Sequence, residues 1–130
     1  MTILIAEDDE DDFFFTARLL KKATSAALLR VESGGAAIDY LAGQGQYADR
    51  QKYPFPDLLL LDLKMDDMDG HAVLAWLRET PGHRPGKVFV LTGSGEMRDR
   101  ERVKASTMAA GYFVKPLTPQ NVETILAQAK

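Results

Sequence analysis

The feature that most constrains the fold is the segment "DLLLLD", residues 57–62. Four consecutive leucines, Leu58–Leu61, are apolar on both faces of a strand, which is typical of a strand inside a parallel sheet covered on both sides. Asp62 follows directly. A carboxylate at the end of a buried strand is costly unless positive charge meets it. The segment therefore predicts a buried strand with a functional group at its carboxyl end.

Short apolar runs alternate with helical patterns along the whole chain. The expected strands are residues 2–6, 26–31, 57–62, 87–92 and 111–115. The expected helices are residues 11–24, 34–43, 70–80, 93–110 and 119–130. Strand–helix alternation predicts a parallel sheet with helices on both faces. A closed barrel needs about eight such units, so we expect an open, doubly wound α/β sheet in a single domain, residues 1–130.

Local sequence signals indicate two helix starts, and one long connection allows two interpretations. Asp69 is a suitable N-cap for the third helix, and Thr118 before Pro119 predicts the start of the last one. Residues 43–56, "GQGQYADRQKYPFP", form a polar connection longer than the usual 2–6 residues. It is either a functional segment or an insertion.

Composition excludes several classes of protein. The chain has no cysteine, so disulfides, thiolate metal sites and thiol nucleophiles are excluded. No apolar run approaches the roughly 20 residues of a membrane span, and the amino end lacks the features of a signal peptide. We expect a cytoplasmic protein with no membrane contact. The net charge of -3 argues against direct nucleic-acid binding, and "RDRERVK" is predicted to be a solvated helix face.

Acidic residues are concentrated at expected strand ends. Ten of the nineteen acidic residues lie in two windows, Glu7–Asp12 and residues 62–69, which is too uneven for a merely solvated surface. The carboxyl ends of parallel strands meet at one edge of the sheet, where ligands bind. The residues expected at that edge are Glu7, Asp8, Asp62, Thr92 and Lys115.

These residue types together suggest phosphoryl chemistry. Clustered carboxylates repel one another, and Mg²⁺ would neutralise them while leaving room for phosphate oxygens. A carboxylate held beside Mg²⁺ and Lys115 can attack a phosphoryl group and form an aspartyl phosphate. Lys115 and the Thr92 hydroxyl would stabilise the phosphoryl charge. Each residue alone has an ordinary role, as a helix start, a turn residue, a strand-end hydroxyl or a surface charge; their joint placement favours the functional interpretation.

Four motifs carry a resemblance over essentially the whole chain. They are E-D-D after the first strand, L-L-D-x-x-M-x-x-M-D-G, V-L-T-G and Y-F-V-K-P. Together they resemble the receiver domain of two-component response regulators. The resemblance implies a flavodoxin-like fold with strand order 2-1-3-4-5.

The resemblance also implies roles for single residues. Asp62 would be the phosphoacceptor, with Thr92 and Lys115 contacting the phosphoryl group. Mg²⁺ would be bound by Asp8 directly, by Glu7 through water, by Asp62 and by the backbone carbonyl of Lys64. Tyr112 would be an aromatic switch, and Pro116 would follow a cis peptide bond. Asp66 stands where the family usually has proline, which adds charge and flexibility beside the site.

The segment "AIDYLAGQGQYADRQKYPFPDLLLLDL" is similar to stand-alone receivers associated with bacterial phytochromes. The expected protein is a stand-alone response regulator without an output domain, since about twelve residues follow Thr118. Its partners would be a sensor histidine kinase, such as a bacteriophytochrome, or a phosphotransfer protein. It would not be an enzyme beyond its own phosphorylation and dephosphorylation. A homodimer is expected through the apolar positions Tyr112, Leu117 and Ile125.

Alternative functions fit the sequence less well. A flavodoxin-like electron carrier needs a phosphate-binding loop where this chain has "EDDEDD", and a haloacid-dehalogenase-type phosphatase needs an acid where it has Lys64. The segment "TGSGE" lacks the Lys-Ser/Thr ending of a P-loop. His71 and His83 are interpreted as surface or loop residues, so the chain is not a histidine phosphodonor. A degenerate receiver that works as an interaction module without phosphorylation remains the second hypothesis.

Overall fold

The computed structural model describes residues 1–65, 67–93 and 97–129. In this part of the chain five parallel strands form one sheet of order β2-β1-β3-β4-β5, as predicted. The strands are β1 (Thr2–Ala6), β2 (Ala27–Val31), β3 (Leu58–Asp62), β4 (Lys87–Thr92) and β5 (Gly111–Val114). From β1 the sheet grows to one side through β2 and to the other side through β3, so the strand order reverses between β1 and β3. Ligands bind at such a switch point in open α/β sheets.

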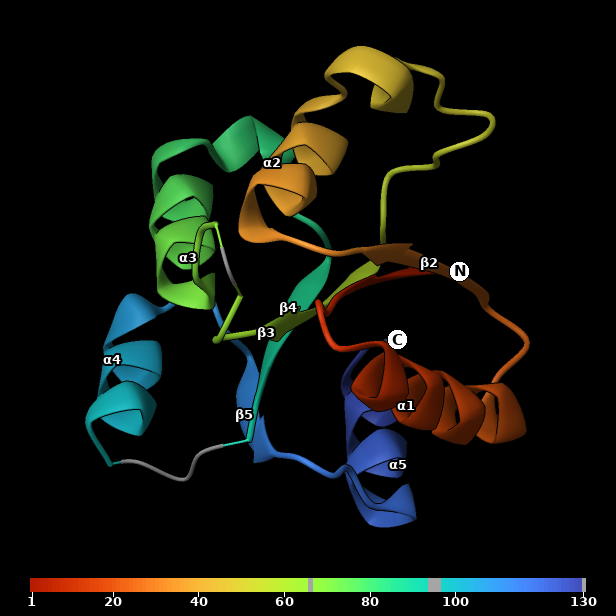
Figure 1. The fold of residues 1–130 in the computed structure, drawn as a ribbon, viewed down its shortest axis with the longest axis vertical. Helices are drawn as coiled ribbons and strands as arrows, with labels where there is room; N and C mark the ends of the chain where they lie inside the picture. Colours follow the sequence, from red (N-terminus) through yellow and green to blue (C-terminus); the bar gives the residue numbers. More distant parts are fainter. Residues whose placement is uncertain (66, 94–96, 130) are drawn as a thin grey trace.

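Helices cover both faces of the sheet. They are α1 (Glu10–Ala23), α2 (Gly34–Ala42), α3 (Gly70–Glu79), α4 (Met97–Ser106) and α5 (Pro119–Gln128), with short 3₁₀ turns η1 (Gly45–Ala48) and η2 (Pro81–His83). Figure 1 shows α1 and α5 together on one face and α2, α3 and α4 on the other. None of the described helices is long and apolar enough to span a bilayer.

The four leucines of β3 explain why the sheet needs two helical layers. Leu59 and Leu61 pack into the core formed with α2 and α3, whereas Leu58 and Leu60 pack into the core formed with α1 and α5. All four side chains are completely buried. Successive side chains of a strand point to opposite faces, so an uninterrupted apolar run requires cover on both sides. The prediction of a two-sided buried strand is confirmed.

Polar caps fix the helix starts. Asp69 accepts a hydrogen bond from the Ala72 amide at 2.9 Å and Thr118 caps α5, so both helix starts are as predicted; the reciprocal capping box of Thr118 with Asn121 was not predicted. Helix α1 begins at Glu10 because Asp9 caps it by accepting from the Asp12 amide. Caps of this kind satisfy amide groups that have no partner within the helix.

The long connection after α2 is folded against the end of that helix. Arg50 donates to two carbonyls in the last turn of α2 and lies over the Tyr40 ring. The Tyr40 hydroxyl donates to the Pro54 carbonyl at 2.8 Å, and its ring contacts those of Tyr47 and Tyr53. Burial raises the pKa of Tyr40 to about 12. The connection therefore stabilises the carboxyl end of α2.

Two expectations about apolar and histidine side chains are wrong. Leu117 and Ile125 are buried, at 3% and 0% exposure, in the core beneath α5, so they cannot form a dimer surface. Tyr112 is half-buried. His71 is not a surface residue, because it is enclosed between α3 and α4 and its Nε2 lies 3.0 Å from Asp99 Oδ1. His83 is exposed in η2, as expected.

Candidate functional site

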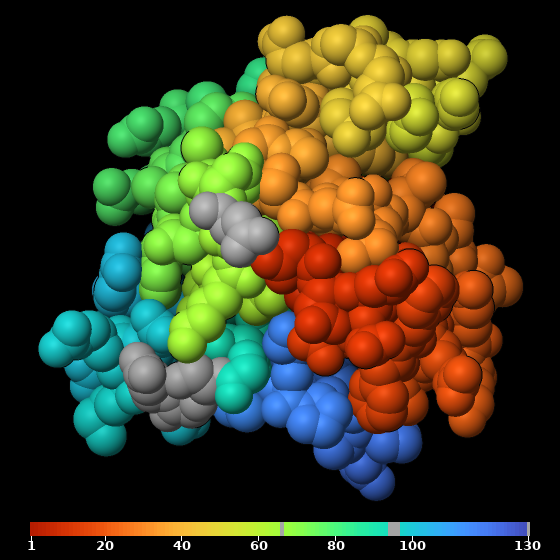
Figure 2. Space-filling view, viewed as in Figure 1, coloured from red at the N-terminus to blue at the C-terminus, as the bar shows by residue number. Residues whose placement is uncertain are grey.

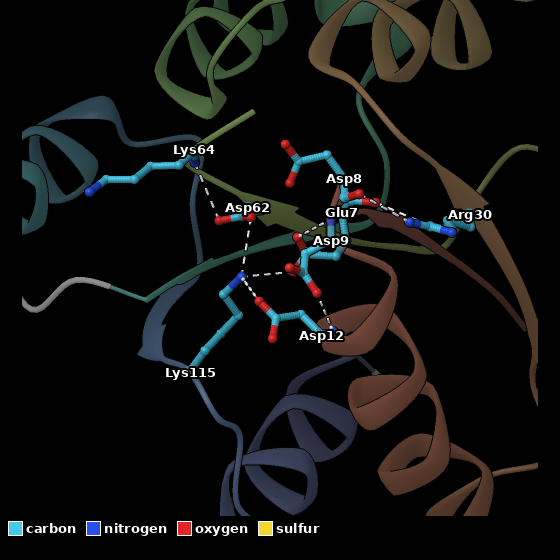
Figure 3. A network of polar contacts seen from close by, with 8 residues as sticks. All are labelled: Glu7, Asp8, Asp9, Asp12, Arg30, Asp62, Lys64 and Lys115. Carbon is cyan, nitrogen blue, oxygen red and sulfur yellow. Dashed lines mark hydrogen bonds and ion pairs between the residues drawn. The ribbon is translucent and has the colours of Figure 1, made fainter. Parts of the chain in front are cut away.

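Three carboxylates meet where β1 and β3 end. Glu7 and Asp8 follow β1, Asp62 ends β3, and one carboxylate oxygen from each lies within 4.8 Å of the others (Figure 3). Glu7 and Asp62 are buried, and Asp8 is partly exposed. On the molecular surface, red residues near the amino end lie beside the yellow-green part of the chain (Figure 2). The prediction that these carboxylates meet at the strand ends is confirmed.

Lys115 directs its ammonium group into this cluster. Its Nζ lies 2.8 Å from Glu7 Oε1, 2.9 Å from Asp12 Oδ2 and 3.2 Å from Asp62 Oδ2 (Figure 3). Lys115 directly follows β5 and precedes a cis bond to Pro116, as the resemblance implied. The Asp12 contact was not predicted. No sequence pattern indicated it, because Asp8 precedes the N-cap Asp9 and only Asp12 lies within α1.

Negative charge exceeds positive charge in the cluster, and two pKa values reflect this. The pKa of Glu7 is raised to about 7, chiefly by burial and also by the neighbouring Asp62, while the hydrogen bond to Lys115 opposes the change. Burial by itself would lower the pKa of Lys115, but hydrogen bonds to Glu7 and Asp12 and the charge of Asp62 raise it above its ordinary value. Lys115 is therefore charged, and the cluster favours an additional cation.

Arg30 of β2 organises the turn that presents the acidic pair. Its Nε donates to the Glu7 carbonyl at 3.1 Å and its Nη2 to the Asp8 carbonyl at 3.4 Å. Its guanidinium carbon lies 4.8 Å from the centre of the Phe13 ring. No sequence pattern indicated this role, because it depends on the pairing of β1 with β2 and on the path of the chain into α1.

Close packing holds Asp62 in place. A Cβ added to Gly70 would lie 2.6 Å from the Asp62 carbonyl oxygen and 2.9 Å from the Leu63 Cα, so α3 approaches the end of β3 as only glycine permits. The Lys64 amide donates to Asp62 Oδ1 at 3.3 Å. The Lys64 side chain extends away from the cluster (Figure 3), so its backbone faces the site.

Thr92 and Tyr112 lie on the neighbouring strands. Thr92 is fully buried at the end of β4, next to the end of β3. Tyr112 of β5 pairs with Val90, two residues before Thr92, so both side chains belong to the same face of the sheet. Asp66 and residues 94–96 of the predicted "TGSGE" turn lie outside the described residues.

Two open cavities give access to the cluster. One of about 470 Å³ is lined by Asp8 and Lys64 and extends to His71 and Asp99. The other, of about 500 Å³, lies on the side of α1 and includes Lys115 in its lining. The cavities therefore open onto Asp8 and Lys115, the neighbours of the buried Asp62, and not onto Asp62 itself.

The donor set fits magnesium. Clustered carboxylates offer the hard oxygen ligands that Mg²⁺ prefers, and a partly exposed Asp8 leaves room for the waters that this ion retains. Among the described residues, Lys115 is the cation that contacts Glu7 and Asp62, so a bound metal ion would supply further positive charge. A soft or nitrogen-ligated metal would find neither cysteine nor histidine among these three residues.

Comparison of the sequence with known proteins finds a matching family model and several related regulatory proteins. The model of the response regulator receiver domain family matches residues 3–127. The chain is 30% identical over 103 residues to a probable methanogenesis regulatory protein, FilR2, of Methanothrix harundinacea, covering 77% of this chain and 61% of that protein. It is 39% identical over 67 residues to the response regulator Rcp1 of Synechocystis, covering 52% and 44%. The chain thus spans about half the length of the curated relatives it matches.

Solved structures extend the likeness to the whole fold. The response regulator RPA3017 in red light signaling of R. palustris is 31% identical with a TM-score of 0.84, and the match covers 98% of this chain and 90% of that one. The phosphorylated cyanobacterial phytochrome response regulator RcpA is 27% identical with a TM-score of 0.81, covering 98% and 89%. The Mn²⁺-bound form of Rcp1 is 29% identical with a TM-score of 0.80, covering 97% and 89%.

Proposed function

This chain belongs to the response regulator receiver domain family, and from that premise we propose that it accepts a phosphoryl group on Asp62 from a phosphohistidine donor. The observation that most supports this is the buried Asp62 carboxylate, 3.2 Å from the Lys115 ammonium and within the carboxylate cluster. In a protein that only docks to partners, a buried carboxylate of this kind would destabilise the fold without serving a function.

In the proposed reaction, an Asp62 carboxylate oxygen attacks the phosphorus of the donor. A new P–O bond forms, the donor's P–N bond breaks, and the electron pair stays on the imidazole nitrogen. The product is an aspartyl phosphate, a mixed anhydride. Lys115 neutralises charge on the phosphoryl oxygens, and the buried Thr92 hydroxyl donates to one of them.

Magnesium would be held by Asp8, by Asp62 and by the backbone carbonyl of Lys64, with Glu7 acting through water. When bound, this ion supplies positive charge to the phosphoryl oxygens and to the crowded carboxylates. The Mn²⁺-bound form of the similar Rcp1 supports a divalent cation in a related protein.

The input proposed is a sensor histidine kinase of the phytochrome class, or a phosphotransfer protein downstream of one. The support is the likeness to RcpA and to RPA3017, whose descriptions name a phytochrome and red light signaling. We propose that the reaction takes place in the cytoplasm, as expected from the sequence. Residues 1–130 would act as one receiver unit that signals through protein contacts, with Tyr112 as the switch residue.

The alternative is a receiver that works as an interaction module without phosphorylation. Labelling with radioactive acetyl phosphate, with Mg²⁺ and with EDTA, separates the two. We expect a magnesium-dependent, hydroxylamine-sensitive label on the wild type and none on Asp62→Asn. Asp11→Asn, an exposed aspartate of α1, is the matched control and should label normally. An unlabelled wild type would favour the interaction module, and a labelled Asp62→Asn would move the acceptor elsewhere.

A further inference from the structure

The ammonium group of Lys115 has no donor left for a phosphoryl group. A lysine ammonium carries three N–H donors, and three carboxylates accept from it: Glu7 at 2.8 Å, Asp12 at 2.9 Å and Asp62 at 3.2 Å. If Lys115 is to bind phosphoryl oxygens, as the proposed function requires, at least one of these hydrogen bonds must weaken.

The three hydrogen bonds differ in what it costs to open them. The side chains of Glu7 and Asp62 are 4% and 5% exposed, so in the metal-free protein a carboxylate that Lys115 leaves there would have little water to replace it. The side chain of Asp12 is 47% exposed, and water can replace the lysine. Asp12 is thus the partner that Lys115 can most easily leave.

The backbone of Asp12 holds its carboxylate in this competing position. Its amide donates to Asp9 Oδ1 at 2.9 Å within the first turn of α1, so the start of the side chain is fixed. Asp12 also lines the cavity beside α1 that includes Lys115. Asp11, the preceding residue, is exposed and is not one of the ion-pair partners of Lys115.

We propose that Asp12 is a positioning residue that competes with the phosphoryl group for Lys115 and so weakens the phosphorylated state. In the resting protein it draws the ammonium toward α1. Once Asp62 carries a phosphoryl group, which adds about -1.5 to -2 charges, Lys115 turns to the phosphoryl oxygens and Asp12 is released to water. This inference rests on the proposed function and adds to it a residue that regulates the phosphorylated state.

Beryllium fluoride, which binds with Mg²⁺ as a phosphoryl mimic, provides a direct test. Asp12→Asn removes the competing charge, so we expect it to bind the mimic about two- to fivefold more tightly than the wild type, the range that a partly exposed ion pair allows. Asp12→Glu retains the charge and should bind like the wild type. Asp11→Asn removes an equal charge outside the ion pairs of Lys115 and should show a smaller gain, which high salt abolishes.

The outcomes separate this inference from the proposed function. A role of Asp12 in structure alone would leave the affinity of Asp12→Asn for the mimic unchanged or reduce it, and either result overturns the proposal. An equal gain in Asp11→Asn would overturn it too, because general charge would then explain the effect. If the wild type takes label at Asp62 and Asp12→Asn shows no gain, only the role of Asp12 fails. If the wild type takes no label, both the proposed function and the role of Asp12 fail.

Discussion

The ammonium nitrogen of Lys115 lies 3.2 Å from Oδ2 of Asp62, and this contact joins the end of β5 to the end of β3 across the intervening strand β4. The same ammonium lies 2.8 Å from Glu7 at the end of β1. A single cation thus holds two buried carboxylates from two different strands. Its charge matters for stability as well as for chemistry.

Removing the charge of Lys115 should destabilise the metal-free protein strongly. Lys115→Met keeps most of the apolar stem but leaves Glu7 and Asp62 buried without their cation, at a cost of about 3 kcal/mol or more. Urea unfolding in EDTA measures the loss, and added Mg²⁺ should recover part of it. The control is Lys64→Met, an exposed side chain near the same site, expected within about 0.5 kcal/mol of the wild type. Equal stabilities of the two variants would contradict the prediction.

The free energy of unfolding should depend on pH through Glu7. Its pKa is raised from 4.5 to about 7 in the folded protein, so the folded state retains a proton that the unfolded state releases. The contribution of Glu7 is therefore fully present below pH 4.5 and is lost as the pH rises through about 7. Without metal, Glu7→Gln should match the wild type at low pH and exceed its stability above pH 7. The free energy of unfolding of Glu10→Gln, at an exposed position of α1, should depend on pH as that of the wild type does.

Magnesium should stabilise the folded state, because an ion that binds only the folded protein does so by mass action. At a concentration 100 times its Kd the gain is about 2.7 kcal/mol, visible as a higher Tm in thermal unfolding. Asp8→Asn removes a carboxylate of the cluster and should abolish the increase. Asp11→Asn, outside the cluster, should retain it. An unchanged magnesium response in Asp8→Asn would place the ion elsewhere.

Much of this arrangement could be predicted from the sequence because it depends on local patterns. Apolar runs set the strands, the N-caps Asp69 and Thr118 set helix starts, and the rule that parallel strands end at one edge brought Glu7, Asp62 and Lys115 together. The strand order came from the family resemblance.

The features that were missed depend on tertiary geometry. Asp12 reaches Lys115 only because of the angle at which α1 leaves β1, and Arg30 depends on the pairing of β1 with β2. Ile125 could have been predicted as buried, since it follows Val122 by three residues on one face of α5. The burial of Leu117 could not, because the path of the chain after Pro116 determines it.

The close approach of α3 to β3 makes Gly70 a sensitive position. In Gly70→Ala the new methyl group would lie 2.6 Å from the Asp62 carbonyl oxygen and 2.9 Å from the Leu63 Cα, and these are backbone atoms with little freedom to move. We expect a loss of about 1–3 kcal/mol in the free energy of unfolding and weaker magnesium binding, since the backbone of Asp62 must shift. Gly82→Ala is the control, as among the described residues no atom beyond its two chain neighbours lies within 4 Å of the added Cβ. Equal magnesium affinity in both variants would show that the close packing at Gly70 does not affect the metal site.

The last prediction concerns how the proposed phosphorylation of Asp62 would change the position of the Tyr112 ring. Thr92 and Tyr112 lie on the same face of the sheet, and Tyr112 packs against the core that contains Val90 and Val103. If the Thr92 hydroxyl turns toward a phosphoryl oxygen, it vacates space beside the half-buried Tyr112 ring. The inward and outward positions of that ring need differ by only a few kcal/mol for a phosphoryl group to change their populations.

Thr92→Ala should therefore still take label at Asp62, while the Tyr112 ring responds less to beryllium fluoride and Mg²⁺ than in the wild type. Thr92→Ser retains the hydroxyl and should restore the response. Solution NMR of the Tyr112 ring measures both variants. A wild-type ring that does not respond to the mimic would make Tyr112 a static packing residue. It would leave Asp62 as the acceptor, because the contact between Asp62 and Lys115 does not depend on any movement of β5.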